Sequence, residues 1–318
     1  MSNNLQVLKI KDFQIWSKLF ENGTSKSIYF HHDFISSTNC NYQYYIIYKN
    51  EQMLAGFVCF INQDKNKIIE NELSIYSGLY FYDRIEKKIN KQRIERINII
   101  QTLLEVINNE YENAAFTLSP DINDLRPFQW FNFENKKEIF NFEIRYTSFL
   151  DLTKSNEDLF EGLSTIRKQN IKYAEKEGLE VVETYDFTNL LYNYKNNLLQ
   201  QSESFSKDYF VNLKQLLSKL FEKKLIKIYE VKRNNESIYS AVFSNIGNTA
   251  EYMYGAGNKE FQKSYDATYL IWKALIELKS LGKTSLNFEG VNSPNRGNFK
   301  LSFGGNLKPY FKIFKLSK

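Results

Sequence analysis

The sequence is poor in the residues that build metal centres, disulfide frameworks and covalent catalytic triads. Among its 318 residues are only two cysteines, Cys40 and Cys59, and two adjacent histidines, His31 and His32. No CxxC or Cys/His cluster has the spacing of a zinc site, and two cysteines cannot form a disulfide framework. No serine or cysteine lies in a nucleophile-elbow motif. We therefore expect no metal, no covalent triad, and a reducing, cytoplasmic setting.

Long apolar runs and low-complexity linkers are also missing. No stretch reaches the about 18 apolar residues that a membrane-spanning helix needs. Residues 1–11 contain no apolar core of signal-peptide length. We expect no membrane span, and two locations stay open: the cytoplasm, or the cytoplasm with peripheral association at the inner membrane.

Charge of one sign does not dominate. The 42 Lys and Arg residues face 37 Asp and Glu residues, which gives a net charge of +5. This weak positive bias suits an anionic substrate but gives no strong electrostatic footprint for nucleic-acid binding.

Length and apolar content are ample, because 318 residues with 42% hydrophobic side chains suffice for two domains with real cores.

Hydrophobic periodicity predicts strands and helices that alternate along the chain. Strands are expected at residues 42–48, 53–61, 72–76, 114–118, 179–184, 225–232, 238–245, 250–255 and 285–288, and a last one at 309–314 that either sheet can receive. Residues 144–152 cross into the second half. Helices are expected at residues 13–20, 89–109, 187–200, 209–223 and 266–281. Ser155 should begin a further helix through a capping box, and Asp266 should cap the last long helix. The pattern favours an α/β fold with mixed sheets.

The two halves repeat the same order of elements: a hairpin, a strand ending in glycine, a long helix, a short strand and an irregular loop. Apolar residues align at a constant separation of 171 positions in the pairs Ile100/Ile271, Leu104/Leu275, Ile107/Leu278 and Phe128/Phe299. This repetition predicts two α/β domains, residues 1–148 and 149–318.

The densest run of unusual residues follows the last short strand. Glu289 ends that strand, Arg296 and Gly297 lie in a predicted loop, and residues 299–305 read FKLSFGG. Glycines let the backbone approach a ligand closely, and the charged side chains have both signs. We interpret this run as a ligand site. The alternative is that the glycines form turns, the aromatics are core residues, and Lys300 is solvated.

The first half lacks this motif. At the separation of 171 positions, Gln129 stands where Lys300 stands, and the paired glycines and the Arg-Gly step have no counterpart. If one half kept the chemistry, it is the second, and the first would form a wall of the substrate cleft.

A basic helix is predicted near the start of the second half, and Gly178 should end it. Lys168, Lys172 and Lys176 are spaced to share one face, with Arg167 at its edge. Leu163, Ile166 and Ile171 are expected to face the core. The guanidinium of Arg167 is well suited to grip a phosphate. The alternative is a solvated face neutralised by Glu175 and Glu177.

Residues 299–305 resemble the C-terminal signature of the Fem-type transferases, the peptidoglycan bridge-forming, FemAB-like enzymes built on the GNAT acyltransferase fold. Residues 163–179 are similar to the basic helix that opens their second domain. The first half matches only in its order of elements. The resemblance implies an α/β (α+β) protein with two tandem GNAT-like domains: a degenerate N-terminal domain, residues 1–148, and a catalytic C-terminal domain, residues 149–318.

The resemblance also implies roles for single residues. Lys300 stands at the position whose lysine stabilises the oxyanion formed during acyl transfer. Arg167, with Lys172, is expected to bind the phosphates of a nucleotide-sugar substrate. The predicted substrate-binding set further contains Arg296, Tyr254 and Asn298.

Two of the predicted roles have open alternatives. Glu289 is the candidate general base for an attacking amine, but it can equally be a turn residue or a salt-bridge partner of Arg296. Tyr252 and Tyr254, which precede Gly255 at a strand end, can line the pocket or belong to the core.

The acyl donor has two candidates, acyl-CoA and aminoacyl-tRNA. CoA-dependent GNAT enzymes carry an (Arg/Gln)-x-x-Gly-x-(Gly/Ala) loop whose amides hold the pyrophosphate, and residues 255–266 lack that spacing. Fem-type enzymes use charged tRNA, and some carry a coiled-coil arm that residues 209–223 are too short to form.

The resemblance implies direct transfer of an acyl or aminoacyl group to an amino group of a bacterial cell-envelope precursor. The expected acceptors are nucleotide-sugar, polysaccharide, lipid-linked or peptidoglycan precursors, and no metal is required. A non-catalytic binding or scaffold protein on the same duplicated frame is the alternative.

Overall fold

The computed structural model describes residues 4–82, 88–134, 138–200 and 205–315. The chain divides into two compact units, which are described separately. Unit 1 consists of Met1–Arg145 and Pro309–Lys318, and unit 2 is Tyr146–Lys308. The sequence left open which sheet receives the last strand. The structure places it in unit 1, because its residues Lys312 to Lys315 pair antiparallel with Thr117 to Ala114.

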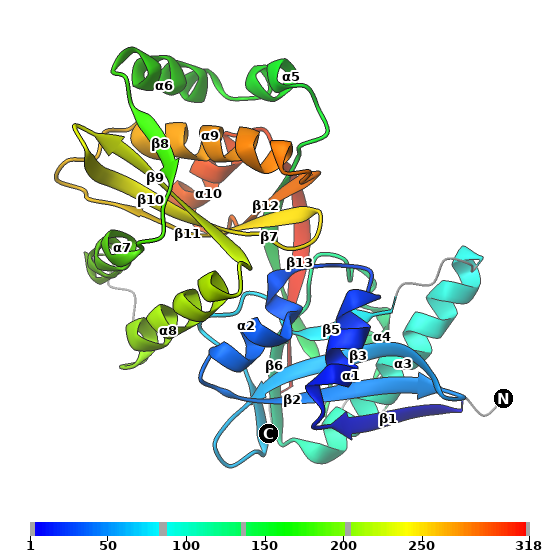
Figure 1. The fold of residues 1–318 in the computed structure, drawn as a ribbon. Coiled ribbons are helices and arrows are strands. Elements are labelled where there is room, and N and C mark those ends of the chain that lie inside the picture. Colours follow the sequence, from blue (N-terminus) through cyan, green and yellow to red (C-terminus); the bar gives the residue numbers. More distant parts are fainter. Residues whose placement is uncertain (1–3, 83–87, 135–137, 201–204, 316–318) are drawn as a thin grey trace. The chain divides into compact units, whose positions relative to one another are not determined.

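Unit 1 contains a mixed sheet with helices on both faces (Figure 1). The strand order is β1 (Leu5–Ile10), β2 (Asn41–Lys49), β3 (Gln52–Ile61), β4 (Lys67–Ile69), β6 (Asn113–Thr117) and β13 (Asn306–Lys315), with β5 (Gly78–Phe81) paired to β3. The helices are α1 (Phe13–Glu21), the short 3-10 helix Ile28–Phe30, α2 (His32–Ser37), α3 (Ile89–Glu110) and α4 (Arg126–Trp130).

The core of unit 1 lies between its sheet and α3. Ile100, Leu104 and Ile107 of α3 pack with Phe57 and Phe116 of the sheet, and all five are at most 2% exposed. The other face of the sheet is covered by α1 and α2, where Trp16 stacks on Tyr44 at 4.5 Å between ring centroids.

The strand predicted at residues 72–76 is wrong. The Asn71 side chain accepts a hydrogen bond from the backbone N–H of Leu73 at 2.8 Å, and the Asn71 carbonyl accepts one from Ser74 at 3.0 Å. These bonds close a turn, since an Asn side chain competes with the ladder for nearby backbone donors. The strand β5 begins only at Gly78, whose φ of +91° a side chain would disfavour.

Unit 2 contains a second mixed sheet with the strand order β7 (Asn141–Asp151, of which the second half belongs here), β12 (Ser285–Gly290), β11 (Thr249–Gly257), β10 (Glu236–Ser244), β9 (Ile226–Arg233) and β8 (Glu180–Glu183). Helix α9 (Asp266–Ser280) covers one face and α6 (Thr165–Lys176) packs against α9. Figure 1 shows α7 (Thr188–Gln200) and α8 (Tyr209–Glu222) on the other face. Short helices α5 (Asn156–Glu161) and α10 (Pro294–Leu301) complete the unit.

Local sequence signals explain most helix ends in unit 2. The Ser155 hydroxyl accepts a hydrogen bond from the Asp158 N–H at 3.0 Å, as the capping box predicts. Gly178, with φ of +67°, follows the end of α6. Asp266 is not the cap of α9, because Tyr265 occupies that position. The buried Asp266 carboxylate instead accepts from the Lys263 N–H at 2.7 Å and pairs with Arg233 at 2.6 Å.

The loop predicted around Arg296 is also wrong, because residues Pro294–Leu301 form helix α10. Proline suits the first turn of a helix, since its fixed φ is helical and its missing N–H would be unpaired there anyway. Gly297 fits inside this helix because a Cβ at that position would lie 2.3 Å from the Val291 carbonyl oxygen.

The structure places the aligned pairs of the repeat on corresponding elements. The elements β5, α3, β6 and α4 of unit 1 follow one another as β11, α9, β12 and α10 do in unit 2. Ile100, Leu104 and Ile107 lie buried on α3, and their partners Ile271, Leu275 and Leu278 lie buried on α9. Phe128 lies on α4 and Phe299 on α10.

Candidate active site

The candidate site lies in unit 2 where two neighbouring strands part. β11 and β12 pair in parallel from Thr249 to Glu251 and from Ser285 to Asn287. Beyond these pairs β11 continues to Gly257 and β12 to Gly290. Where two neighbouring strands stop pairing, the backbone N–H and C=O groups along their facing edges no longer bond to each other. These groups can then contact a ligand.

Glu289 lies at the end of β12 in a strained backbone conformation. Its φ is +60°, which is uncommon for a residue with a side chain, and its side chain is only 2% exposed. The register between β12 and β7 shifts between Asn287 and Gly290, so this segment is a bulge. The Asn287 side-chain oxygen fixes it by accepting from the Glu289 N–H at 2.8 Å and from the Thr147 hydroxyl at 2.5 Å. A buried carboxylate is thereby held at the strand end.

Lys300 returns from α10 to the same strand end. Its Nζ donates a hydrogen bond to the Gly290 carbonyl at 3.0 Å and lies 5.6 Å from the centre of the Tyr252 ring. The pKa of Lys300 is lowered to about 8, chiefly by burial, while the Glu289 carboxylate raises it and the Arg296 charge lowers it. A lysine with this pKa is largely charged at neutral pH and loses its charge slightly above it.

Tyr252 and Tyr254 form the β11 side of the site. The Tyr252 hydroxyl hydrogen-bonds the Tyr239 hydroxyl at 3.0 Å, and the Tyr254 ring packs edge-on against Tyr194 of α7 at 5.6 Å. Burial raises the pKa of both Tyr252 and Tyr254 well above the usual range, and the negative charge of Glu289 adds to this in both. Both phenols are therefore neutral. Gly255 is required here, because a Cβ would lie 2.0 Å from the Tyr252 hydroxyl.

Arg167 joins α6 to the first turn of α9 and to α10. Its guanidinium donates a hydrogen bond to the Thr268 hydroxyl and lies 4.7 Å from the centre of the Phe299 ring. Asn170 donates to the same hydroxyl at 3.3 Å and to the Ser264 carbonyl at 3.2 Å. Burial lowers the pKa of Arg167, and its buried Nε has no hydrogen-bond partner in the described part of the chain.

The other residues of the basic helix are closer to solvent. Lys172 and Lys176 are exposed, and Lys168 pairs with Glu161 at 2.7 Å. Leu163 and Ile171 are buried, as the sequence predicts, but Ile166 is 54% exposed, so its predicted orientation is wrong. Arg167 faces α9. Because adjacent residues of a helix point in different directions, the neighbouring Ile166 points toward solvent.

The structure therefore gathers most, but not all, of the predicted residues. Glu289, Lys300, Arg296 and Tyr254 are linked by electrostatic interaction. Arg167 reaches α10 through the Phe299 ring, which is 5.4 Å from Phe303. Asn298 and Lys172 are exposed, and no described contact links them to Lys300. The contacts of Tyr194, Tyr239 and Thr268 were not predicted. None of the three lies in a recognisable motif, and two of them are tyrosines in a sequence that contains 22.

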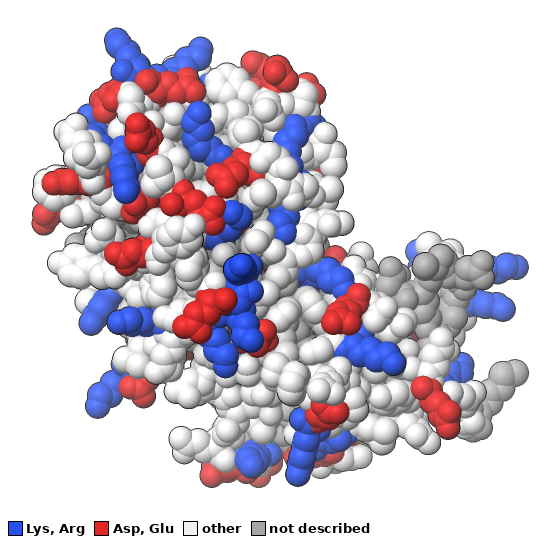
Figure 2. Space-filling model, viewed as in Figure 1, with Lys and Arg blue, Asp and Glu red and all other residues white. Residues whose placement is uncertain are grey.

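Surface charge gives no dominant field on the face that Figure 2 shows, where basic and acidic side chains are interspersed. No helix in the described residues is both long and apolar enough to cross a membrane. Within the same described ranges, no group of three or more His, Cys, Asp or Glu side chains is placed to hold a metal ion.

No protein-family model matches this sequence, and no curated protein matches it either. Solved structures do match. The crystal structure of FemX superposes with a TM-score of 0.63 and 11% identity over 96% of each chain. The structure of L-PGS from Bacillus licheniformis gives 0.58 and 10% over 96% of this chain and 92% of the other. A tandem GNAT protein from the clavulanic acid biosynthesis pathway gives 0.52 and 8% over 98% of this chain and 97% of the other.

At these identities the likeness shows the fold alone. The chain has a mixed α/β, GNAT-like fold that extends over nearly its whole length in each comparison. The predicted fold class is confirmed, and the resemblance to Fem-type transferases is confirmed at the level of the fold.

Proposed function

We propose that the protein is an acyltransferase that moves an aminoacyl or acyl group onto an amino group of a cell-envelope precursor. The observation that carries this proposal is the Lys300 ammonium, held by the Gly290 carbonyl beside the buried Glu289 carboxylate where β11 and β12 part. The similarity to FemX and to L-PGS supports the choice of donor and acceptor classes.

Acyl transfer of this kind proceeds by direct attack of the acceptor amine on the carbonyl carbon of the donor. The carbonyl oxygen then becomes an oxyanion, and a fixed cation in a dry site stabilises that charge as it develops. We assign this role to Lys300, whose position is fixed by one backbone hydrogen bond and one aromatic ring. Collapse of the intermediate expels the oxygen or sulfur of the donor.

Glu289 is the proposed general base. The attacking amine must lose a proton as the new C–N bond forms, and a carboxylate within hydrogen-bond reach can accept it. Glu289 is the buried carboxylate at the strand end whose charge acts on Lys300, Tyr252 and Tyr254. Its strained φ is consistent with a conformation kept for function rather than for stability.

Substrate binding is proposed for the residues around this pair. Arg167 offers a planar guanidinium with a buried, unpaired Nε, which suits a phosphate oxygen of a nucleotide-sugar or lipid-linked acceptor. Arg296 adds positive charge near Lys300. Tyr254, Asn298 and the exposed Lys172 complete the proposed set. Unit 1 is proposed as the degenerate domain.

The donor is proposed to be aminoacyl-tRNA or acyl-CoA. The segment between β11 and α9 is short, residues 258–265, and lacks the glycine spacing of standard CoA loops. This favours charged tRNA. The helices α7 and α8, with 13 and 14 residues, are too short for a long tRNA-binding arm, so any tRNA contact would be small.

A labelled-transfer assay tests the proposal. The protein is incubated with labelled acetyl-CoA or with charged tRNA, together with an amino-bearing nucleotide sugar or a peptidoglycan precursor, and the label on the acceptor is measured. We expect transfer by the wild type and by Lys273→Met, an exposed lysine on α9, and none by Lys300→Met. Absence of transfer from every donor, in folded protein that also binds none of them by calorimetry, would favour the scaffold alternative.

A further inference from the structure

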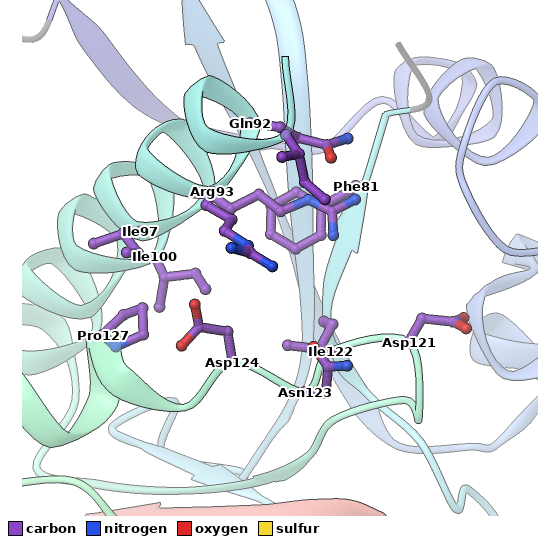
Figure 3. A pocket seen from close by; sticks show the side chains of 12 residues that line it. Phe81, Gln92, Arg93, Ile97, Ile100, Asp121, Ile122, Asn123, Asp124 and Pro127 are labelled. Carbon is purple, nitrogen blue, oxygen red and sulfur yellow. The ribbon is translucent and has the colours of Figure 1, made fainter. Parts of the chain in front are cut away.

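Unit 1 contains a cavity that the proposed reaction does not use. It has a volume of about 210 Å³ and lies between the first half of α3, the end of β5 and the loop that leads into α4. Figure 3 shows the Arg93 side chain reaching from α3 into this space, with Asp124 on the opposite wall. The site is therefore built from three separate segments of one unit.

The cavity lies among elements of unit 1 that correspond to elements of the candidate active site in unit 2. At the separation of 171 positions, Phe81 of the cavity corresponds to Tyr252, and Ile100 corresponds to Ile271. The loop residues 121–124 correspond to residues 292–295, at the start of α10. Lys300 and Glu289 of unit 2 correspond to Gln129 and Leu118, which do not line the cavity. The cavity is therefore a separate site, with arginines on its wall.

The charge of the cavity favours an anion. Arg93 and Arg96 lie one turn apart on α3, and Arg96 stacks over Phe81 at 4.6 Å from the ring centre. Asp124 is already paired on both oxygens, because Arg126 donates from Nε at 2.9 Å and from Nη2 at 2.6 Å. The Arg93 charge also acts on Asp124 and lowers its pKa. When Arg126 is included, the described side chains at this site carry three positive charges and two negative ones, those of Asp121 and Asp124. A guanidinium binds a carboxylate through two parallel hydrogen bonds.

The rest of the lining favours an apolar body. Ile97, Ile100, Ile122 and Pro127 contribute hydrocarbon surface, and Ile100 and Ile122 are almost fully buried. A volume of 210 Å³ holds about seven waters at ~30 Å³ each, which corresponds to a ligand of roughly seven to ten non-hydrogen atoms. Nucleotides and CoA are far larger than this.

We propose that this cavity binds a small monocarboxylate with a short or branched apolar chain, whose carboxylate contacts Arg93 and Arg96. The proposal does not depend on the activity assigned to unit 2. It gives unit 1 a ligand of its own.

Calorimetry with three matched ligands tests the proposal. 4-Methylpentanoate has the expected size and charge, 4-methylpentanamide has the same shape without the charge, and leucine adds an ammonium group. We expect 4-methylpentanoate to bind at least tenfold more tightly than either of the others. Equal binding of the amide would show that the arginines do not recognise the ligand. Tighter binding of leucine would point to a zwitterion site that uses Asp121, and either result overturns the proposal.

Variants locate the binding in the cavity. Arg93→Gln should weaken 4-methylpentanoate binding at least tenfold, and Ile97→Trp should block it by filling the space while both arginines stay in place. Lys91→Gln, an exposed change on the same helix, should bind as the wild type does. Circular dichroism and the melting temperature confirm that each variant folds. Unchanged binding in folded Arg93→Gln or Ile97→Trp would refute the site.

Discussion

The same corner of a repeated fold has taken two different forms in this chain. In unit 2 the strand end, long helix and short helix bring a lysine and a buried glutamate together. In unit 1 the corresponding elements surround a cavity with two arginines. Both corners stack an arginine on an aromatic ring, Arg167 on Phe299 at 4.7 Å and Arg96 on Phe81 at 4.6 Å, but from different helices. The shared elements determine where a site can form in each unit, and the side chains at that position determine what it can bind or catalyse.

Moving the lysine between the two corners should produce the largest effect. Lys300→Met removes the cation that stabilises the oxyanion, so we expect the transfer rate to fall by a factor of roughly 100 or more. Gln129 is the counterpart of Lys300 in unit 1 and is exposed. Adding Gln129→Lys to Lys300→Met should restore nothing, because the buried Leu118 stands at the unit 1 counterpart of Glu289 and supplies no carboxylate. The measurement is the transfer rate of the single and double variants.

Two results would break the comparison. Recovery of activity in the double variant would mean that unit 1 has kept a working reaction site. Near-normal activity in Lys300→Met, with Lys273→Met as the control, would mean that the reaction does not depend on Lys300 of unit 2.

The units also differ in what completes their folds, because unit 1 takes its last strand from the end of the chain. Lys315 of β13 is 3% exposed and donates to the Tyr111 carbonyl at 3.1 Å and to the Asn108 side chain at 2.8 Å, at the end of α3. Lys315→Met removes both hydrogen bonds and leaves the carbonyl of the buried Tyr111 without this donor, which costs about 1–3 kcal/mol of the free energy of unfolding. Urea denaturation measures the loss.

Hydrogen exchange separates a local effect from a global one. In Lys315→Met, exchange should accelerate in β6 and α3 and stay unchanged in α9 and β10. Lys308→Met, an exposed change in the same strand, should stay within about 0.5 kcal/mol of the wild type. Equal acceleration in both units would show that they unfold as one body.

Much of this fold follows from patterns in the sequence. The long helices α3 and α9 were predicted within one residue at each end, because their apolar residues recur at helical spacing and strand signals follow. A hairpin was predicted in each half, and at the two turns Asn50, Glu51, Asn234 and Asn235 have the positive φ of the turn type that joins antiparallel strands. The destination of β13 was not predictable, because either sheet could accept its alternating pattern.

For the candidate site, the sequence pointed to residues but not to their geometry. The motif pointed to Lys300 and Glu289, and the structure brings their charges together. Pro294, Arg296 and Gly297 were interpreted as loop residues, although a proline at the first helical position is compatible with a helix start. The strain at Glu289 depends on the Asn287 side chain, which Thr147 holds from a distant strand, and the need for Gly255 depends on where the Tyr252 and Tyr239 hydroxyls pack. Local propensity carries no information about either.

The two stacked arginines sharpen the comparison at a smaller scale. Arg167→Gln keeps a polar side chain but loses the charge near Phe299, so we expect the KM for a phosphate-bearing acceptor to rise about tenfold, which corresponds to about 1.4 kcal/mol. Arg96→Gln should leave the transfer kinetics unchanged and weaken only the binding of 4-methylpentanoate. Steady-state kinetics and calorimetry on both variants distinguish the two sites, and exchanged effects would contradict their assignment.

The smallest effect concerns how each corner sets the pKa of a lysine. Burial, the Glu289 carboxylate and the Arg296 charge together set the pKa of Lys300 at about 8: burial and Arg296 lower it, and Glu289 raises it. Because only the charged lysine stabilises an oxyanion, activity should fall as pH rises through about 8. Arg296→Gln removes a repelling charge and should move this fall to higher pH. Glu289→Gln removes an attracting charge and should lower the pKa, which NMR of the Lys300 side chain reports even where activity is lost.

The lysine introduced by Gln129→Lys is exposed and should titrate near the ordinary value of about 10.4. If both lysines titrated alike, the two corners would not differ in their electrostatics.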